Sequence, residues 1–272
     1  MNFWLVSLLA VCPITLRAQL AWVPEEAPQM VFAGEAGQIR VTFSNPTDKT
    51  VEVQICTRLF QASSATAMPL DQAQPWKKLQ VLPGQTILEW ASVTFPAVKT
   101  GTRFLVQWLD ENGKVLGPTE VTVQPHGLLT ELKSLAGEGS LGVFDPQDKL
   151  KPLLKQLMVD YEDLERTGWE NFSGRLAIVG PLPPQEPMDL ARRIKSVVKA
   201  GHAVVWMQPP SRLQASSDSG SYLIREGDGT VVIARSKHFA DLAENPRAQL
   251  DLVHLASLAL KPEHWESTVL EP

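Results

Sequence analysis

Between residues 22 and 124 the hydrophobic and polar positions alternate with a period of two. The segment 37–44 places Ile39, Val41 and Phe43 on one face of a strand. Asn112-Gly113 is a typical hairpin turn. Short strands separated by turns predict an all-β antiparallel sandwich over 22–124 with immunoglobulin-like architecture. Other segments with strand character are 51–56, 86–90, 103–109 and 120–124, and the Ala-, Ser-, Gln- and Pro-rich residues 61–76 are expected to form a loop.

After Pro125-His126-Gly127 the pattern changes to apolar runs that alternate with amphipathic segments. Asp148 is expected to cap the second of these helices, and Gly201 to end the third. This alternation predicts an α/β domain over 128–262, flavodoxin-like with a mostly parallel sheet, followed by a tail at 263–272. The expected strands are 140–145, 175–181 and 202–208 with a short one near 160–164 and a hairpin at 222–235, and the expected helices are 128–135, 149–158, 188–199 and 247–260.

The first residues have the pattern of a removable signal peptide. Residues 3–16 carry no charge, but the run contains Pro13 and is shorter than the about 20 residues that span a bilayer. We therefore expect a signal peptide at 1–18 with cleavage beside Ala18 or Ala21, an exported protein that is periplasmic or secreted, and no transmembrane segment after its removal. Two alternatives are a buried first strand of the next domain and a lipoprotein site at Cys12, against which the preceding Val11 argues.

Removal of the signal peptide would leave Cys56 as the single cysteine. One cysteine forms no internal disulfide, which excludes a disulfide-stapled extracellular scaffold. Cys56 lies within a strand pattern and is expected to be a small buried hydrophobic residue.

Charge and motifs exclude several function classes. The 25 basic and 30 acidic residues give a net charge of −5 and form no basic face, so we expect no nucleic-acid partner. Gly137 to Gly142 matches the dinucleotide fingerprint GxGxxG, but these glycines precede a strand and do not follow one, which indicates a connector. The five histidines lack metal spacing, and the acidic run at 160–165 is expected to be a solvated edge. The sequence thus predicts no cofactor and no metal site.

The segment 140–260 resembles the class I glutamine amidotransferase-like fold. The resemblance is carried by Leu-Gly-Val-Phe-Asp at 141–145, Arg-Leu-Ala-Ile-Val-Gly-Pro at 175–181 and Ala-Gly-His-Ala-Val-Val-Trp-Met-Gln at 200–208. In that family the last of these strands leads into a turn that bears a nucleophilic cysteine. Here the turn reads Met207-Gln208-Pro209-Pro210, and no His-x-Glu pair follows. The resemblance therefore implies a degenerate domain that has lost the family's chemistry. Similar empty domains accompany sandwich domains in some exported carbohydrate-active proteins.

The residues at the carboxyl ends of the predicted parallel strands would line any ligand pocket of such a sheet. They are Asp145, Gly180, Pro181 and Gln208, although Asp-Pro and Gly-Pro pairs also end strands where no ligand is present. Among the tryptophans, Trp76 and Trp169 lie in predicted loops and are the candidates for sugar platforms, although loop tryptophans usually pack against the protein. The strand patterns predict Trp90, Trp108 and Trp206 to be core residues.

Two functions compete on this evidence. The first is a non-catalytic binding or assembly protein of the bacterial envelope, with a protein partner or a glycan as ligand and with oligomerisation as one form of assembly. The second is an exported glycan-active hydrolase, or an accessory subunit of one, that uses carboxylates such as Asp145. A cleft that holds two or more convergent acids would favour the hydrolase.

Overall fold

A computed structural model describes residues 20–182, 189–208, 221–235, 239 and 241–263. The chain is mostly β, with three sheets, and its contacts divide it into two compact units. The first unit comprises Met1–Gln29, Gln38–Val93 and Arg103–Val121, and the second comprises Met30–Gly37, Thr94–Thr102 and Thr122–Pro272.

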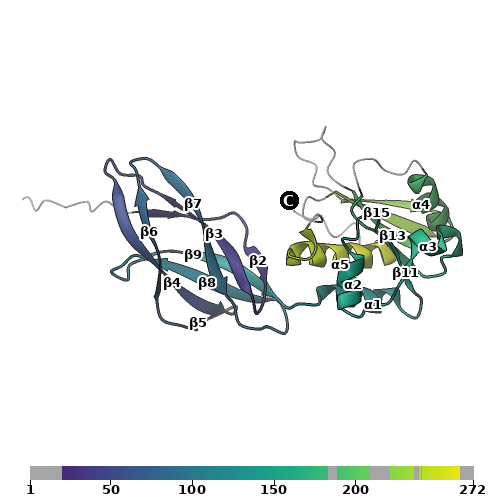
Figure 1. Cartoon of the computed structure of the whole chain (residues 1–272), viewed down its shortest axis with the longest axis horizontal. Coiled ribbons are helices and arrows are strands. Elements are labelled where there is room, and N and C mark those ends of the chain that lie inside the picture. The colour runs from purple at the N-terminus through teal and green to yellow at the C-terminus, as the bar shows by residue number, and fades with distance from the viewer. Residues whose placement is uncertain (1–19, 183–188, 209–220, 236–238, 240, 264–272) are drawn as a thin grey trace, which may run out of the picture. The chain divides into compact units, whose positions relative to one another are not determined.

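Nine strands form two of the sheets (Figure 1). One sheet has the order β1-β3-β7, and the other has the order β2-β9-β8-β4-β5 with β6 also paired to β4. The pairs β1–β3, β4–β5, β4–β6 and β4–β8 are antiparallel. The strands are β1 (Ala21–Val23), β2 (Gln29–Phe32), β3 (Ala36–Ser44), β4 (Val51–Ala62), β5 (Ala67–Pro69), β6 (Gln74–Val81), β7 (Thr86–Thr94), β8 (Thr102–Leu109) and β9 (Val115–Gln124).

These two sheets share a core built from alternate residues of their strands. Ile39, Val41 and Phe43 of β3 are fully buried, which confirms the face predicted from their period of two. The rings of Phe43 and Trp108 meet edge to face at a centroid distance of 6.0 Å, so side chains of β3 and β8 contact each other directly. Trp108 also donates a hydrogen bond of 2.8 Å from Nε1 to Oγ1 of Thr119.

The loop predicted for residues 61–76 is wrong in part. Strand β4 continues to Ala62, β5 lies within the segment, and β6 begins at Gln74. The polar composition misled the prediction because these residues belong to strands with exposed side chains: all three residues of β5 are exposed. Edge strands tolerate such a polar composition because neither face has to be buried.

The third sheet is mostly parallel, as predicted. Its order is β11-β10-β12-β13-β15-β14, in which the first five strands are parallel and β14 joins β15 as an antiparallel hairpin. Gly227, at a φ of 63°, occupies the hairpin turn. The strands are β10 (Leu141–Phe144), β11 (Tyr161–Asp163), β12 (Leu176–Val179), β13 (Ala203–Gln208), β14 (Ser221–Glu226) and β15 (Gly229–Arg235).

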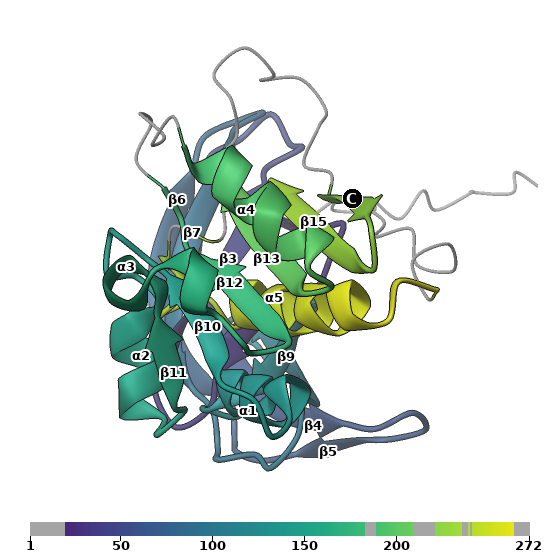
Figure 2. The ribbon, with the colours of Figure 1, turned by 90° about the vertical axis from the view of Figure 1, so that its right-hand side faces the viewer.

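Helices cover both faces of this sheet (Figure 2). Leu141, Val143 and Ile178 face a core completed by η1, α1, α2 and α5, whereas Ala177 and Val179 face a second core completed by α3, η2 and α4. Two buried faces explain why the strands read as continuous apolar runs. The helices are η1 (Leu128–Thr130), α1 (Glu131–Ala136), α2 (Lys151–Gln156), α3 (Leu164–Thr167), η2 (Trp169–Asn171), α4 (Leu190–Lys199) and α5 (Pro246–Leu260).

The helix predicted for 149–158 is α2, which is shorter than expected at both ends and covers Lys151–Gln156. Asp148 has a φ of 52° and donates its backbone N–H to the carbonyl oxygen of Asp145, so it belongs to a turn and not to the helix. Asp148 therefore is not the cap. Residues 137–140 of the glycine-rich segment connect α1 to β10, and its last glycine, Gly142, lies within β10. None of the helices in the described ranges is long and apolar enough to cross a membrane.

Candidate functional site

The candidate site lies at the carboxyl edge of the parallel sheet, where the strand order reverses. After β10 the chain adds β11 on one side and then β12 on the other, so Asp145 and Gly180 flank the reversal point. Open α/β sheets bind ligands in the crevice at this point. Two of the four residues predicted for a pocket therefore lie side by side where a ligand would be expected.

Asp145 and Gly180 contact each other directly and fill the space between the two strand ends. The backbone N–H of Gly180 donates to the carbonyl oxygen of Phe144 at 2.7 Å. A Cβ atom on residue 180 would come within 2.5 Å of Oδ1 of Asp145. Glycine is thus required here because the carboxylate occupies the space that a side chain would need.

The carboxylate of Asp145 serves as the cap of α2. Its Oδ2 accepts hydrogen bonds from the backbone N–H groups of Leu150 at 2.6 Å and Lys151 at 2.9 Å. These are N–H groups that a helix start leaves without an intrahelical partner. Asp145 is 0% exposed, and its Oδ1 has no hydrogen-bond partner among the residues that the structure describes. The carboxylate is therefore shielded from any reactant in solution.

A charged cluster surrounds this cap. The ammonium group of Lys151 donates to Oε1 of Glu165 at 2.6 Å and lies 3.0 Å from Oδ1 of Asp163. The same Glu165 oxygen accepts the backbone N–H of Asp145 at 2.8 Å. Lys151 is buried, and its two acidic partners are about three-quarters and two-thirds buried, with side-chain exposures of 24% and 31%. The cluster ties β10, α2 and α3 together.

The environment fixes the charge states of this cluster. Burial by itself would lower the pKa of Lys151, but hydrogen bonds and charge from Glu165 and Asp163 outweigh it and raise that pKa above its ordinary value. Burial would likewise raise the pKa of Asp163, but hydrogen bonds from Lys151 and from the Glu165 amide, with the nearby charges, lower it. At neutral pH Lys151 therefore stays an ammonium group and Asp163 a carboxylate.

A wide depression of about 760 Å³ lies beside the cluster. Charges of both signs border it, and its wall includes Asp148 and Met158, two non-glycine residues with φ values of 52° and 54°. Asp145 is not part of the wall. The depression suits contact with a polar partner surface better than enclosure of a small apolar ligand. It is lined by Asp148, Lys151, Lys155, Met158, Val159, Asp160, Tyr161, Asp163, Glu165 and Arg166.

The other two predicted residues are placed less fully. Pro181 is half-buried directly after Gly180. The backbone of Gln208 ends β13, in register with Arg235 of β15, and its neighbours 209 and 210 lie outside the described residues. The structure therefore brings Asp145 and Gly180 together, and it places Gln208 at the end of a strand of the same sheet.

Sequence reasoning missed Lys151 and misjudged its acidic partners. The run at 160–165 was expected to be a solvated edge, but Asp163 and Glu165 turn toward the buried Lys151. Lys151 lies fourteen residues before Glu165, so no local spacing links the two. The only signal is a lysine on the otherwise apolar side of a helix. Among the described residues, no three His, Cys, Asp or Glu side chains are grouped closely enough to hold a metal ion.

The expectations for the tryptophans were partly wrong. Trp169 is 3% exposed and packs on Phe144, so it presents no platform. Trp76 lies in β6, not in a loop, is half-buried and packs on Trp108. Trp108 and Trp206 are buried, as predicted, but Trp90 is 56% exposed. Cys56 is half-buried in β4, less covered than expected.

No protein-family model and no protein of curated function matches the chain. Among solved structures, a β-glucosidase from Listeria innocua in complex with glucose matches with a TM-score of 0.30 and 16% identity, over 39% of this chain and 16% of that chain. A DNA-bound alkylpurine DNA glycosylase from Pseudomonas fluorescens matches with a TM-score of 0.31 and 16% identity, over 40% and 31%. The chain thus spans less than a third of the length of these proteins, and neither likeness carries an argument about fold or function.

Proposed function

We propose that this chain is an exported, non-catalytic binding or assembly protein of the bacterial envelope, whose parallel-sheet unit acts as an interface or ligand-binding module. The observation that carries this proposal is the ion-pair network in which the buried Lys151 lies 3.0 Å from Asp163 and 2.6 Å from Glu165, with pKa shifts that favour the charged forms of Lys151 and Asp163. General acid–base catalysis needs an ionisable group with a pKa value moved toward neutrality. In this cluster the pKa values move away from neutrality, as in a structural ion-pair network.

The position of Asp145 supports the same proposal over the hydrolase alternative. A glycoside hydrolase needs two carboxyl groups that face the substrate from opposite sides. Asp145 is fully buried and occupied as a helix cap, and Glu165 and Asp163 both bind Lys151. The wide, charged depression beside them suits a polar partner.

We further propose that the α/β part of the chain, over 128–262, is a degenerate relative of the class I amidotransferase-like fold and that 22–124 form an immunoglobulin-like domain. The order β11-β10-β12-β13 and the parallel registers of these strands support a flavodoxin-like sheet. Gln208 ends β13, near the position to which the resemblance would assign the family's cysteine.

The structure also bears on the proposed export signal. Leu20 is buried and Ala21 begins β1, where it pairs with Ser44. Cleavage after Ala18 would keep this strand whole, whereas cleavage after Ala21 would remove its first residue. Fractionation of the native host with N-terminal sequencing tests the proposal: a mature protein that begins at Gln19 outside the cytosol supports it, and an uncleaved cytosolic protein refutes it.

Catalysis and binding can be separated with the whole chain and two matched variants. We would measure release of reducing ends from glycans and peptidoglycan, thermal stabilisation by the same materials, and self-association by light scattering. The proposal predicts stabilisation or self-association without product release. Hydrolysis that is lost in Glu165→Gln and kept in the control Asp148→Asn would establish the hydrolase instead.

A further inference from the structure

Strand β7 ends the sheet β1-β3-β7, and one of its backbone edges pairs with no strand in the described part of the chain. Its outward side chains carry no charge, and two of them are large and apolar, with Leu88 52% and Trp90 56% exposed. A long, uncharged edge of this kind is a template for pairing with another strand. The outward residues of β7 are Thr86, Leu88, Trp90, Ser92 and Thr94.

The other edge strands that the structure describes are protected against such pairing. Proteins protect edge strands by making them short or by placing charges or proline on them. Strands β1, β2, β5 and β11 have only three or four residues each. Strand β6 carries Pro75, Lys77 and Lys78, and β14 carries Arg225 and Glu226. Strand β7 has nine residues, no proline and no outward charge, which indicates that its edge is used for pairing.

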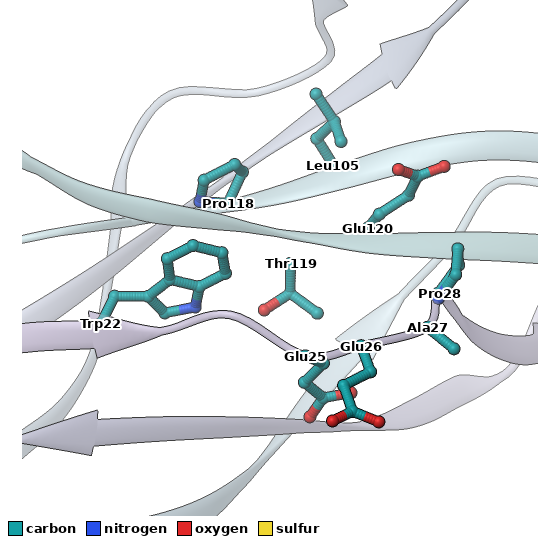
Figure 3. Close-up of a pocket in the computed structure, with 9 residues that line it drawn as sticks. All are labelled: Trp22, Glu25, Glu26, Ala27, Pro28, Leu105, Pro118, Thr119 and Glu120. Atoms are coloured by element: carbon teal, nitrogen blue, oxygen red, sulfur yellow. The ribbon is translucent and has the colours of Figure 1, made fainter.

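The opposite end of the same sheet, at β1, packs on the chain itself. The ring of Trp22 lies beside Pro118 of β9 (Figure 3). A Cβ atom on Gly117 would collide with this ring, so the ring lies directly against the β9 backbone. Glu25, which follows β1, accepts a hydrogen bond of 2.9 Å from Arg40 of β3. Within the described structure, the sheet is thus left open at β7 and not at β1.

The backbone groups on the open edge of β7 belong to the same residues as its outward side chains. The carbonyl oxygens of Gln85 and Phe95 accept hydrogen bonds from Asn45 and Gly34, on the side of β3. Exposure alternates without a break along β7, so no bulge changes the order between these two residues. The odd-numbered residues therefore direct their N–H and C=O groups to β3, and the even-numbered residues direct theirs to the open edge.

Two copies of β7 complement each other as an antiparallel pair. When Trp90 faces its own counterpart, Leu88 faces Ser92 and Thr86 faces Thr94 of the second copy. All five residues present their backbone groups to the open edge, so each facing pair can exchange two hydrogen bonds. Diagonal neighbours in such a pair are within reach of aromatic side chains, so each Trp90 ring would contact Leu88 of the other copy as well.

The inward residues match in the same register. Ile87 faces Val93, a favourable pair of β-branched side chains, and Glu89 faces Ala91. An inward charge can itself protect an edge, but the carboxylate of Glu89 lies 2.7 Å from the ammonium group of Lys77 in its own chain. No like charges therefore face each other across the pair. This self-complementarity favours a second copy of the chain over an unrelated partner.

We propose that β7 pairs with β7 of a second copy, across a twofold axis at Trp90, to form one continuous sheet of the order β1-β3-β7-β7-β3-β1. A pair of single strands makes a small interface, so we expect a weak dimer with a dissociation constant of about 10–100 μM. At about 1 μM the chain is then monomeric, and substitutions at Trp90 leave its stability unchanged. This surface lies outside the parallel sheet and goes beyond the proposed function, which does not depend on it.

Sedimentation equilibrium of the whole chain from about 5 to 500 μM tests this proposal, and a monomer–dimer equilibrium is expected. Trp90→Lys should weaken the dimer at least tenfold, because two ammonium groups would then face each other at the axis. Met68→Lys is the matched control, since Met68 is an apolar residue of another edge strand of the sandwich, β5, and is 59% exposed. It should associate as the unaltered chain does. Circular dichroism checks that each variant is folded.

Leu88→Lys and Ser92→Glu test the register. Each substitution alone should weaken association by about two- to tenfold, because it places an unpaired charge at the interface. In the double variant the new ammonium and carboxylate groups face each other between copies, so association should return to within about threefold of the unaltered chain. The two positions are about 13 Å apart along one strand, too far for an ion pair within one chain.

Four results would each overturn the proposal: a chain that is monomeric at about 500 μM, a dimer that Trp90→Lys leaves unchanged, a dimer that Met68→Lys weakens equally, or a double variant no better than its parents. Each would leave the function proposed for the parallel-sheet unit intact. Product release, stabilisation by glycans, and association of the folded Trp90→Lys variant test that function separately.

Discussion

Gly180 lies directly against the carboxylate of Asp145, and the contact leaves no room for a side chain: a Cβ on residue 180 would be 2.5 Å from Oδ1 and 3.0 Å from Cγ. Asp145 cannot move aside without giving up its bonds to the start of α2. We therefore expect Gly180→Ala to lower the free energy of unfolding by about 1–3 kcal/mol, the usual cost of overpacking. Urea unfolding followed by circular dichroism measures it.

Gly139→Ala is the control for this prediction. The nearest atom to a Cβ on residue 139 is Cα of Gly174 at 3.4 Å, an ordinary contact. Its free energy of unfolding should stay within about 0.5 kcal/mol of that of the unaltered chain. Equal midpoints for the two variants would show that the crevice is not closed by this contact.

The assignment of the α2 cap to Asp145 can be tested against Asp148. Asp145→Asn replaces one carboxylate oxygen by an NH₂ group, which would be buried beneath Gly180 without an acceptor, and it weakens the charge-assisted bonds to Leu150 and Lys151. We expect a loss of about 1–3 kcal/mol in urea unfolding. Asp148→Asn should change little, because asparagine tolerates the φ of 52° and Asp148 caps no helix in the described structure. The reverse order of the two effects would restore Asp148 as the cap.

Lys151→Met should destabilise the protein at neutral pH by about 1–3 kcal/mol, between the values for exposed and buried ion pairs, because it removes the buried cation shared by Asp163 and Glu165 and leaves Asp163 only the exposed Arg166. The lowered pKa of Asp163 makes its contribution complete above the ordinary value of 3.8 and lost as the pH falls through the folded-state pKa. The raised pKa of Lys151 makes its contribution complete below 10.5 and lost as the pH rises above that value.

The difference between Lys151→Met and the unaltered chain should therefore be constant from roughly pH 5 to 9 and shrink below about pH 4. Urea unfolding across this pH range measures the difference. Lys133→Met removes a cation that lies 3.8 Å from Asp160, in a pair whose side chains are 65% and 97% exposed, and it should have no effect. A difference that persists unchanged at pH 2 would mean that Lys151 acts through packing alone.

The strands of the parallel sheet could be predicted from the sequence because each of them is a continuous apolar run. Val143, Ile178 and Val205 belong to apolar runs that are buried on both faces, so the chain has one way to satisfy them. The exact start of α2 could not be predicted in the same way. Asp145 and Asp148 both precede the helix, and the choice between them depends on the φ of Asp148 and on the space left by Gly180, which lies on another strand.

For the candidate site, the sequence predicted only the residues that end the parallel strands. Parallel strands bring their carboxyl ends to one edge, so Asp145 and Gly180 could be expected at the same edge, but their direct contact could not. Lys151 and Glu165 could not be paired from the sequence, because their contact depends on how α2 and α3 pack at the edge of β10. The pairing of Lys151 with the acidic run therefore depends on tertiary packing and not on local sequence.

The clearest error of the sequence prediction concerns which face of β7 is buried, because Trp90 was expected in the core. The segment Ile87-Leu88-Glu89-Trp90 carries apolar residues on both faces, so alternation alone did not fix which face is buried. In the structure Glu89 points to the half-buried side, where Lys77 lies 2.7 Å from its carboxylate, and Trp90 is 56% exposed. Trp108, which the same pattern also predicted to be core, is fully buried and bonded to Thr119.

Matched substitutions should separate the two tryptophans. Trp108→Phe leaves a void and removes the hydrogen bond to Thr119, so we expect a loss of about 1–3 kcal/mol in urea unfolding. Trp90→Phe should stay within about 0.5 kcal/mol of the unaltered chain, as surface substitutions do. The emission of the two variants provides a second readout: loss of Trp108 should shift the remaining fluorescence to longer wavelength, because a buried indole emits at shorter wavelength than a solvated one. A large loss of stability in Trp90→Phe would mean that a partner surface covers β7 in the folded protein.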